Sequence, residues 1–114
     1  MKAARLVFCL VVVMGMLFLL LRYISPVNGT EGALREEAIQ AGQRLYRNLK
    51  TSGADLSAGP CISQQILPDW CVDLVHSPRI PSDDLPANRC PTYLDGRVRH
   101  QVELDLEGRL IRAE

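Results

Sequence analysis

An uncharged stretch near the amino terminus constrains this 114-residue chain more than any other feature. Residues 6–21 are apolar and without charge, Lys2 and Arg5 precede them, and Arg22 follows them. As a helix, this stretch would be about 24 Å long, slightly less than the roughly 30 Å of a bilayer's hydrocarbon core. Arg5 and Arg22 can extend their charged ends to the headgroups and so lengthen the effective span. The sequence therefore predicts a single-pass membrane anchor within residues 1–24, which contacts the membrane through residues 6–21.

A cleaved signal peptide is the alternative interpretation of the same stretch. Pro26 and the small residues around Gly29 would suit a processing site before Thr30, and cleavage near Gly29 would give a secreted protein. Against cleavage, the apolar core exceeds the usual length of about 7 to 15 residues, and Arg22 lies between that core and the cut. Under both interpretations the basic residues favour an inside amino terminus. Residues 25–114 then form a single small extracytoplasmic domain.

The charge of the exported part excludes one class of partner. Three of the 13 basic residues, Lys2, Arg5 and Arg22, flank the anchor, so ten basic side chains accompany all 13 acidic ones in residues 25–114. A nucleic-acid surface needs a basic patch, and this composition argues against one. We therefore expect no nucleic-acid partner.

Three cysteines in the exported part predict a disulfide, because disulfides persist outside the cytoplasm. Pro60 precedes Cys61 and Pro91 follows Cys90, which places both cysteines in loops, whereas Cys71 lies in a strand-like run. This favours a bond between Cys61 and Cys90, which would stabilise the fold by about 3 to 4 kcal/mol through the closed loop. Pairing of Cys71 with either partner stays open at this point.

Residues 30–52 have the pattern of an amphipathic helix. Thr30 is a suitable cap, Gly53 a suitable stop, and apolar residues recur at steps of three and four. The apolar stripe consists of Leu34, Ala38, Ala41, Leu45 and Leu49, and it is widened by Ile39, Gly42 and Tyr46. Residues 53–69 contain several glycines and prolines and are expected to be a connector with one helical turn.

Two later segments alternate with the period of a strand. In residues 70–76, Trp70, Val72, Leu74 and His76 share one face, opposite Cys71, Asp73 and Val75. In residues 98–106, apolar residues alternate with charged or polar ones, which predicts a half-buried strand with a polar outer face. A turn then leads into a short strand at residues 109–113. The predicted fold class is α+β, with a helix packed on a small antiparallel sheet of three or four strands.

Candidate chemistry is sparse. His76 and His100 lie on the apolar faces of their predicted strands, and either histidine together with Cys71 is the alternative thiol or metal site. The intervals between these residues are unlike those of zinc or Cys-x-x-Cys motifs. Asp83 and Asp84, in the proline-rich loop 77–89, are interpreted as solvated. We therefore expect no catalytic residue, no resident metal, no cofactor and no enzymatic activity.

The carboxy-terminal half resembles small exported prokaryotic proteins without an assigned activity. The resemblance rests on Gly59-Pro60-Cys61, on Asn88-Arg89-Cys90, and on Val102-Glu103-Leu104-Asp105 with Gly108. The final strand, turn and strand are also similar to hairpins of small extracytoplasmic modules such as PepSY domains. Neither resemblance implies a catalytic residue.

Two functional hypotheses follow from these features. The first is a membrane-tethered, noncatalytic extracytoplasmic domain that binds or supports an envelope component, with partner contacts expected at the loop 77–89. The second is a small metal- or thiol-dependent envelope protein that uses Cys71 with His76 or His100.

Overall fold

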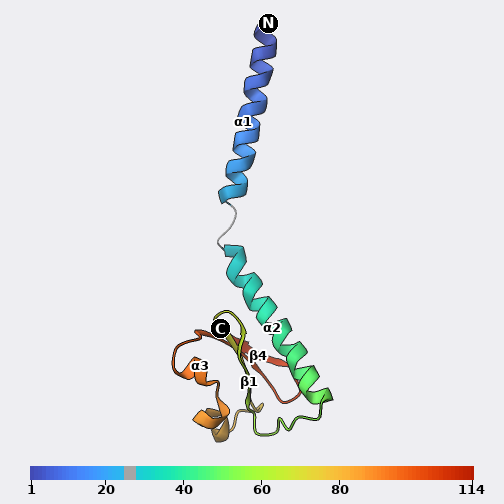
Figure 1. Cartoon of the computed structure of the whole chain (residues 1–114), viewed down its shortest axis with the longest axis vertical. Coiled ribbons are helices and arrows are strands. Elements are labelled where there is room, and N and C mark those ends of the chain that lie inside the picture. Colours follow the sequence, from blue (N-terminus) through green and yellow to red (C-terminus); the bar gives the residue numbers. More distant parts are fainter. Residues whose placement is uncertain (25–27) are drawn as a thin grey trace. The chain divides into compact units, whose positions relative to one another are not determined.

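The computed structural model describes residues 1–24 and 28–114; Pro26, assigned above to a processing site, lies outside them. The described residues form two compact units, 1–32 and 33–114, each of which is considered by itself. The elements, labelled in Figure 1 where space allows, are α1 (Lys2–Ile24), α2 (Asn28–Thr51), β1 (Cys61–Leu67), β2 (Trp70–Leu74), the 3₁₀ helices η1 (Pro81–Asp84) and η2 (Pro86–Asn88), α3 (Pro91–Leu94), β3 (His100–Leu104) and β4 (Leu110–Ala113).

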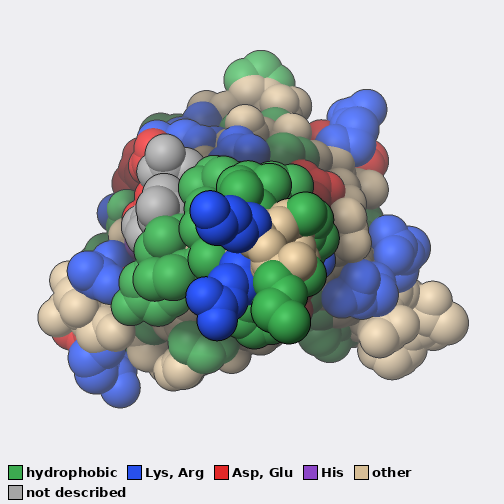
Figure 2. Space-filling model, turned by 90° about the horizontal axis from the view of Figure 1, so that it is seen from above, with side chains coloured by type: hydrophobic (Ala, Val, Ile, Leu, Met, Phe, Trp, Pro, Cys, Tyr) green, Lys and Arg blue, Asp and Glu red, His purple; other side chains and the backbone are tan. Residues whose placement is uncertain are grey.

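The first helix agrees with the predicted apolar segment. Its residues Lys2–Tyr23 are long and apolar enough to cross a membrane, a condition that a signal sequence near the amino terminus also meets. Figure 2, seen from above the amino-terminal end, shows hydrophobic side chains around this helix. The Arg22 guanidinium lies over the Phe18 ring, 5.3 Å from its centroid, so the charge that closes the apolar segment packs along the helix.

The second helix packs one face on the sheet. It begins at Asn28, two residues before the predicted cap Thr30, and ends at Thr51, just before Gly53. Gly53 has a φ of +80°, the left-handed conformation that often follows a helix. Gly42 allows a close approach to the sheet, because a Cβ at this position would lie 3.1 Å from a methyl group of Val72.

The sheet has the strand order β1-β2-β3-β4. The sequence predicts an antiparallel sheet, and this is correct for β1 with β2 and for β3 with β4. It is wrong for the central pair, because β2 and β3 are parallel. Parallel neighbours need a long crossover, which residues 75–99 supply. The sheet is therefore mixed, within the predicted α+β class.

The strand β1 is a second correction. Its sequence predicts a connector with a helical turn, since glycines and prolines surround a short apolar piece. In the structure, residues 61–67 pair with β2 through a tight hairpin in which Asp69 has a φ of +68°. Pairing with a buried neighbour decides this conformation, and a local pattern contains no information about that neighbour.

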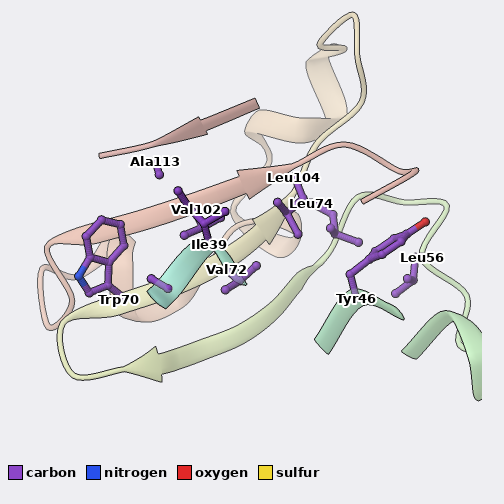
Figure 3. Packing of buried hydrophobic residues seen from close by; sticks show 10 residues of the cluster. Ile39, Tyr46, Leu56, Trp70, Val72, Leu74, Val102, Leu104 and Ala113 are labelled. Carbon is purple, nitrogen blue, oxygen red and sulfur yellow. The ribbon is translucent and has the colours of Figure 1, made fainter. Parts of the chain in front are cut away.

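Alternation along β2 and β3 is confirmed on the side that faces α2. Trp70, Val72, Leu74, Val102 and Leu104 are buried in one cluster with residues of α2 (Figure 3). This cluster also contains Ala38, Ile39, Tyr46, Leu56 and Ala113. It forms the main hydrophobic core between the helix and the sheet.

The opposite face of the sheet is also covered, which the sequence does not predict. The expected solvent-facing residues Gln101 and Glu103 are each only 2% exposed. The crossover segment, residues 75–99, lies over this face, and Cys71, Cys90 and Val98 form a second buried cluster there. A polar residue that alternates with apolar ones is expected to face water, but here a long loop excludes the water.

Candidate functional site

Two carboxylates lie side by side beneath the crossover. Asp73 of β2 and Glu103 of β3 are directly opposed in the parallel pair. Their neighbours Val72 and Val102 point to the main core, so both acidic side chains point to the crossover face. Only 1% of Asp73 and 2% of Glu103 are exposed. Buried charges are costly unless they are paired, so the surroundings of this pair indicate what the site can do.

The Glu103 carboxylate is paired on both oxygens. Nη1 of Arg79, from the crossover, donates to Oε1 at 3.2 Å. Nε of Arg112, from β4, lies 3.2 Å from Oε2. Two guanidinium groups from distant parts of the chain thus converge on one buried acid, an arrangement that offsets the cost of its burial.

Asp73, by contrast, has no hydrogen-bond partner for either carboxylate oxygen within the described part of the chain. Burial and, to a lesser extent, the neighbouring Glu103 raise the pKa of Asp73 to about 7. This value includes the opposite, smaller effect of Arg89. This carboxyl group therefore gains or loses its proton close to neutral pH. It is the chemically unusual group on this face of the sheet.

An open hollow of about 470 Å³ lies above Glu103. Its lining consists of Arg79, Asp84, Arg89, Glu103, Ile111 and Arg112. Arg79 also binds Asp84, with Nη2 at 2.9 Å from Oδ1, and Arg112 lies 3.2 Å from the Glu114 carboxylate. Arg79 and Arg112 are therefore held in place by acidic partners on two sides.

Arg89 differs from the other two arginines of the hollow. Its Nε is buried and has no hydrogen-bond partner among the described residues, and its guanidinium lies 5.6 Å from the centroid of the Tyr93 ring. Its side chain forms no ion pair with any residue that the structure describes. Arg89 also borders a second hollow of about 560 Å³, where Pro60, Pro86 and Pro91 surround the start of β1.

The cysteines of the exported part have distinct positions. Cys61 and Cys90 form a disulfide with their Cα atoms 4.9 Å apart, the pair that their flanking prolines favour. Cys71 is a free, fully buried thiol in the cluster with Cys90. Burial, together with the nearby Asp73 carboxyl, raises the pKa of Cys71 to about 12. A thiol of this kind is a poor nucleophile at neutral pH, because the thiolate is the reactive form.

Both histidines have partners other than Cys71. His76 Nδ1 lies 2.8 Å from Asp83 Oδ1, and its Nε2 lies 3.0 Å from the Ser57 carbonyl oxygen. The His100 ring stacks on Trp70 at a centroid distance of 4.7 Å, on the main-core side of the sheet. In residues 1–24 and 28–114, no group of three or more His, Cys, Asp or Glu side chains is arranged to hold a metal ion.

Asp83 corrects the interpretation of the acidic pair as solvated. Asp84 is exposed, but Asp83 is only 1% exposed. Burial raises the pKa of Asp83, but hydrogen bonds from the Ile80 N–H and from His76 outweigh this effect and leave the pKa lowered. Asp83 therefore anchors the start of the crossover to the end of β2.

No family model, curated protein or solved structure matches this chain. Its function must therefore be inferred from its own residues.

The arginines of the hollow could not be found from the sequence pattern. Arg79 and Arg89 come from the crossover and Arg112 from the last strand, and nothing in their spacing indicates that they meet. One signal does exist. Asp73 interrupts the apolar run of the short strand β2, whereas Glu103 belongs to a regular alternation in β3 and gives no such signal.

Proposed function

We propose that this protein is a membrane-tethered, noncatalytic extracytoplasmic domain that binds or supports another component of the cell envelope. The long apolar helix α1 supports the tether. The disulfide between Cys61 and Cys90 supports an oxidising location for the domain, since disulfides rarely persist in the cytoplasm. The carboxy-terminal domain would then lie on the outer side of the membrane.

The open hollow above Glu103 is the observation that supports binding. Recognition sites are often loops held by a rigid sheet, and the crossover segment is such a loop, fixed to β1 by the disulfide at Cys90. The hollow is lined by three arginines, the side chain best suited to planar, multidentate recognition. A surface that merely covers a sheet has no need of buried charges that converge on an opening.

Site-specific photo-crosslinking in native membranes tests this proposal. Ile111 lines the hollow and is 46% exposed, so a photo-reactive amino acid at this position reports on whatever occupies the hollow. Its neighbour Leu110 is 39% exposed but does not line the hollow, which makes it a matched control on the same strand. We expect a discrete crosslinked product from position 111 in the membrane fraction and at least tenfold less from position 110.

The yield of the crosslinked product at position 111 should also depend on the side chains that line the hollow. The substitution Arg79→Gln removes one guanidinium from the lining and should reduce the yield of the product at position 111. Equal crosslinking at positions 110 and 111, or no product at either, would contradict a binding role for this face.

A further inference from the structure

The three arginines of the hollow differ in their ion pairs. Arg79 is engaged by Asp84 and Glu103, and Arg112 is engaged by Glu103 and Glu114. Arg89 has no ion pair among the described residues, although the buried Asp73 interacts with it electrostatically. A ligand that pairs with the Arg89 guanidinium would therefore carry a negative charge.

The surroundings of Arg89 are those of a prepared anion receptor. A buried N–H group without a partner is costly, and a guanidinium offers two parallel N–H donors that match a carboxylate. The Tyr93 ring against this guanidinium limits its movement, which lowers the entropy lost on binding. Asp73 is buried nearby, but neither of its carboxylate oxygens forms a hydrogen bond with a described residue. It is therefore not a direct partner of Arg89.

The second hollow indicates what the rest of the ligand is. Arg89 borders both hollows, and the second hollow is also bordered by the rings of Pro60, Pro86 and Pro91. Apolar lining of this kind suits the apolar side chains of a ligand such as a peptide. The edge of β1 is less suited to strand addition here, because Thr92 Oγ1 already donates to the Gln64 carbonyl at 2.6 Å.

We propose that Arg89 binds the free carboxy-terminal carboxylate of a peptide whose last, apolar residues lie in the proline-lined hollow. A chain that ends at Arg89 leaves the pairs of Glu103 with Arg79 and Arg112 in place. A chain that continued from Arg89 into the first hollow would meet the carboxylate of Asp84, which lines that hollow and has a side chain that is 63% exposed. This inference rests on the proposed binding function and specifies its ligand.

A titration followed by NMR tests the inference on the full chain in zwitterionic micelles. The probe is the peptide N-acetyl-Ala-Pro-Leu with a free carboxy terminus, and the control is the same peptide as its amide. We expect the acid to shift the backbone amide resonances of residues 61–64 and the Arg89 Nε–H resonance saturably. The amide should bind at least tenfold more weakly.

Two arginine variants give a matched comparison. Arg89→Gln should weaken binding of the acid at least tenfold, whereas Arg97→Gln should leave it unchanged, because Arg97 is an exposed arginine of the same segment outside both hollows. The comparison of acid with amide uses the unaltered protein, so its outcome does not depend on the folding of a variant.

Equal binding of acid and amide would overturn the inference, as would equal effects of the two arginine variants. Tighter binding of inorganic phosphate than of the peptide acid would also overturn it. If the inference fails while the product at Ile111 still forms, the proposed function stands with a different ligand. If the acid shows no preference over the amide and no crosslinked product forms at position 111, the proposed function is contradicted as well.

Discussion

Replacing Asp73 with asparagine should make the domain more stable at high pH. The side chain of Asp73 is 1% exposed and neither oxygen has a hydrogen-bond partner among the described residues. Burial, together with Glu103, raises the pKa of this carboxyl group to about 7, from 3.8 in the unfolded chain. Folding therefore favours the protonated form, and the native state loses stability as the pH rises from about 4 to about 7. Asparagine stays neutral at every pH and avoids this loss.

The magnitude follows from the two pKa values. One pKa unit corresponds to about 1.4 kcal/mol, so ionising Asp73 in the folded state costs about 4 kcal/mol once the pH exceeds 7. At pH 5 about 1.5 kcal/mol of this cost is already present, and at pH 8 nearly all of it is. The variant should therefore gain about 2 to 3 kcal/mol relative to the wild type between pH 5 and pH 8. In a domain of this size that is about 10 °C or more in Tm.

Urea unfolding of the full chain in micelles measures the difference in free energy of unfolding between the variant and the wild type. Trp70 fluorescence is the probe, because Trp70 is the single tryptophan and lies in the main core. The control is Asp95→Asn. The Arg97 N–H lowers the pKa of the exposed Asp95, so this group stays ionised from pH 5 to pH 8 and its removal leaves the pH slope unchanged. A stability difference between Asp73→Asn and the wild type that is the same at pH 5 and pH 8 would rule out a raised pKa at Asp73.

Three further substitutions test the supports of the fold. Replacing both Cys61 and Cys90 with serine should cost about 3 to 4 kcal/mol in urea unfolding, and a loss below 1 kcal/mol would mean that the loop is constrained without the bond. Gly108→Ala should lower stability by about 2 to 4 kcal/mol, since the position has a φ of +81° and a Cβ there would overlap the Tyr46 ring; an unchanged Tm would contradict this packing. Asp83→Ala should cost about 1 to 3 kcal/mol at neutral pH, because two partly buried backbone N–H groups, those of His76 and Ile80, lose their acceptor, and hydrogen exchange at Ile80 should become faster.

Local patterns predicted the elements that are defined by their own periodicity. The apolar segment of α1 and the alternation of Trp70, Val72 and Leu74 appear in the structure, and α2 ends close to Gly53. The stripe of α2 is confirmed in part: Ala38 and Leu49 contact the main core, but Leu34 is 40% exposed. The buried face is shifted toward Ile39 and Tyr46. Such periods reflect one face that must be buried, and they are visible without knowledge of the neighbours.

The features that the sequence does not show depend on distant parts of the chain. The strand β1 forms because β2 pairs with it, and β2 and β3 are parallel because the crossover returns the chain in the same direction. Glu103 is buried because that crossover covers a face which alternation assigns to solvent. The hollow above Glu103 depends on the crossover and on the position of β3 in the sheet, so its arginines could be identified only in three dimensions.

Whether the domain is both tethered and oxidised can be decided from the mass of the intact protein from native membranes, with and without reduction and thiol alkylation. We expect the full-length chain with one disulfide and with Cys71 alkylated only after unfolding, because this thiol is fully buried. A chain that begins near Thr30 would mean a secreted protein without a tether. Free thiols at Cys61 and Cys90 in the native protein would contradict an oxidised, extracytoplasmic domain.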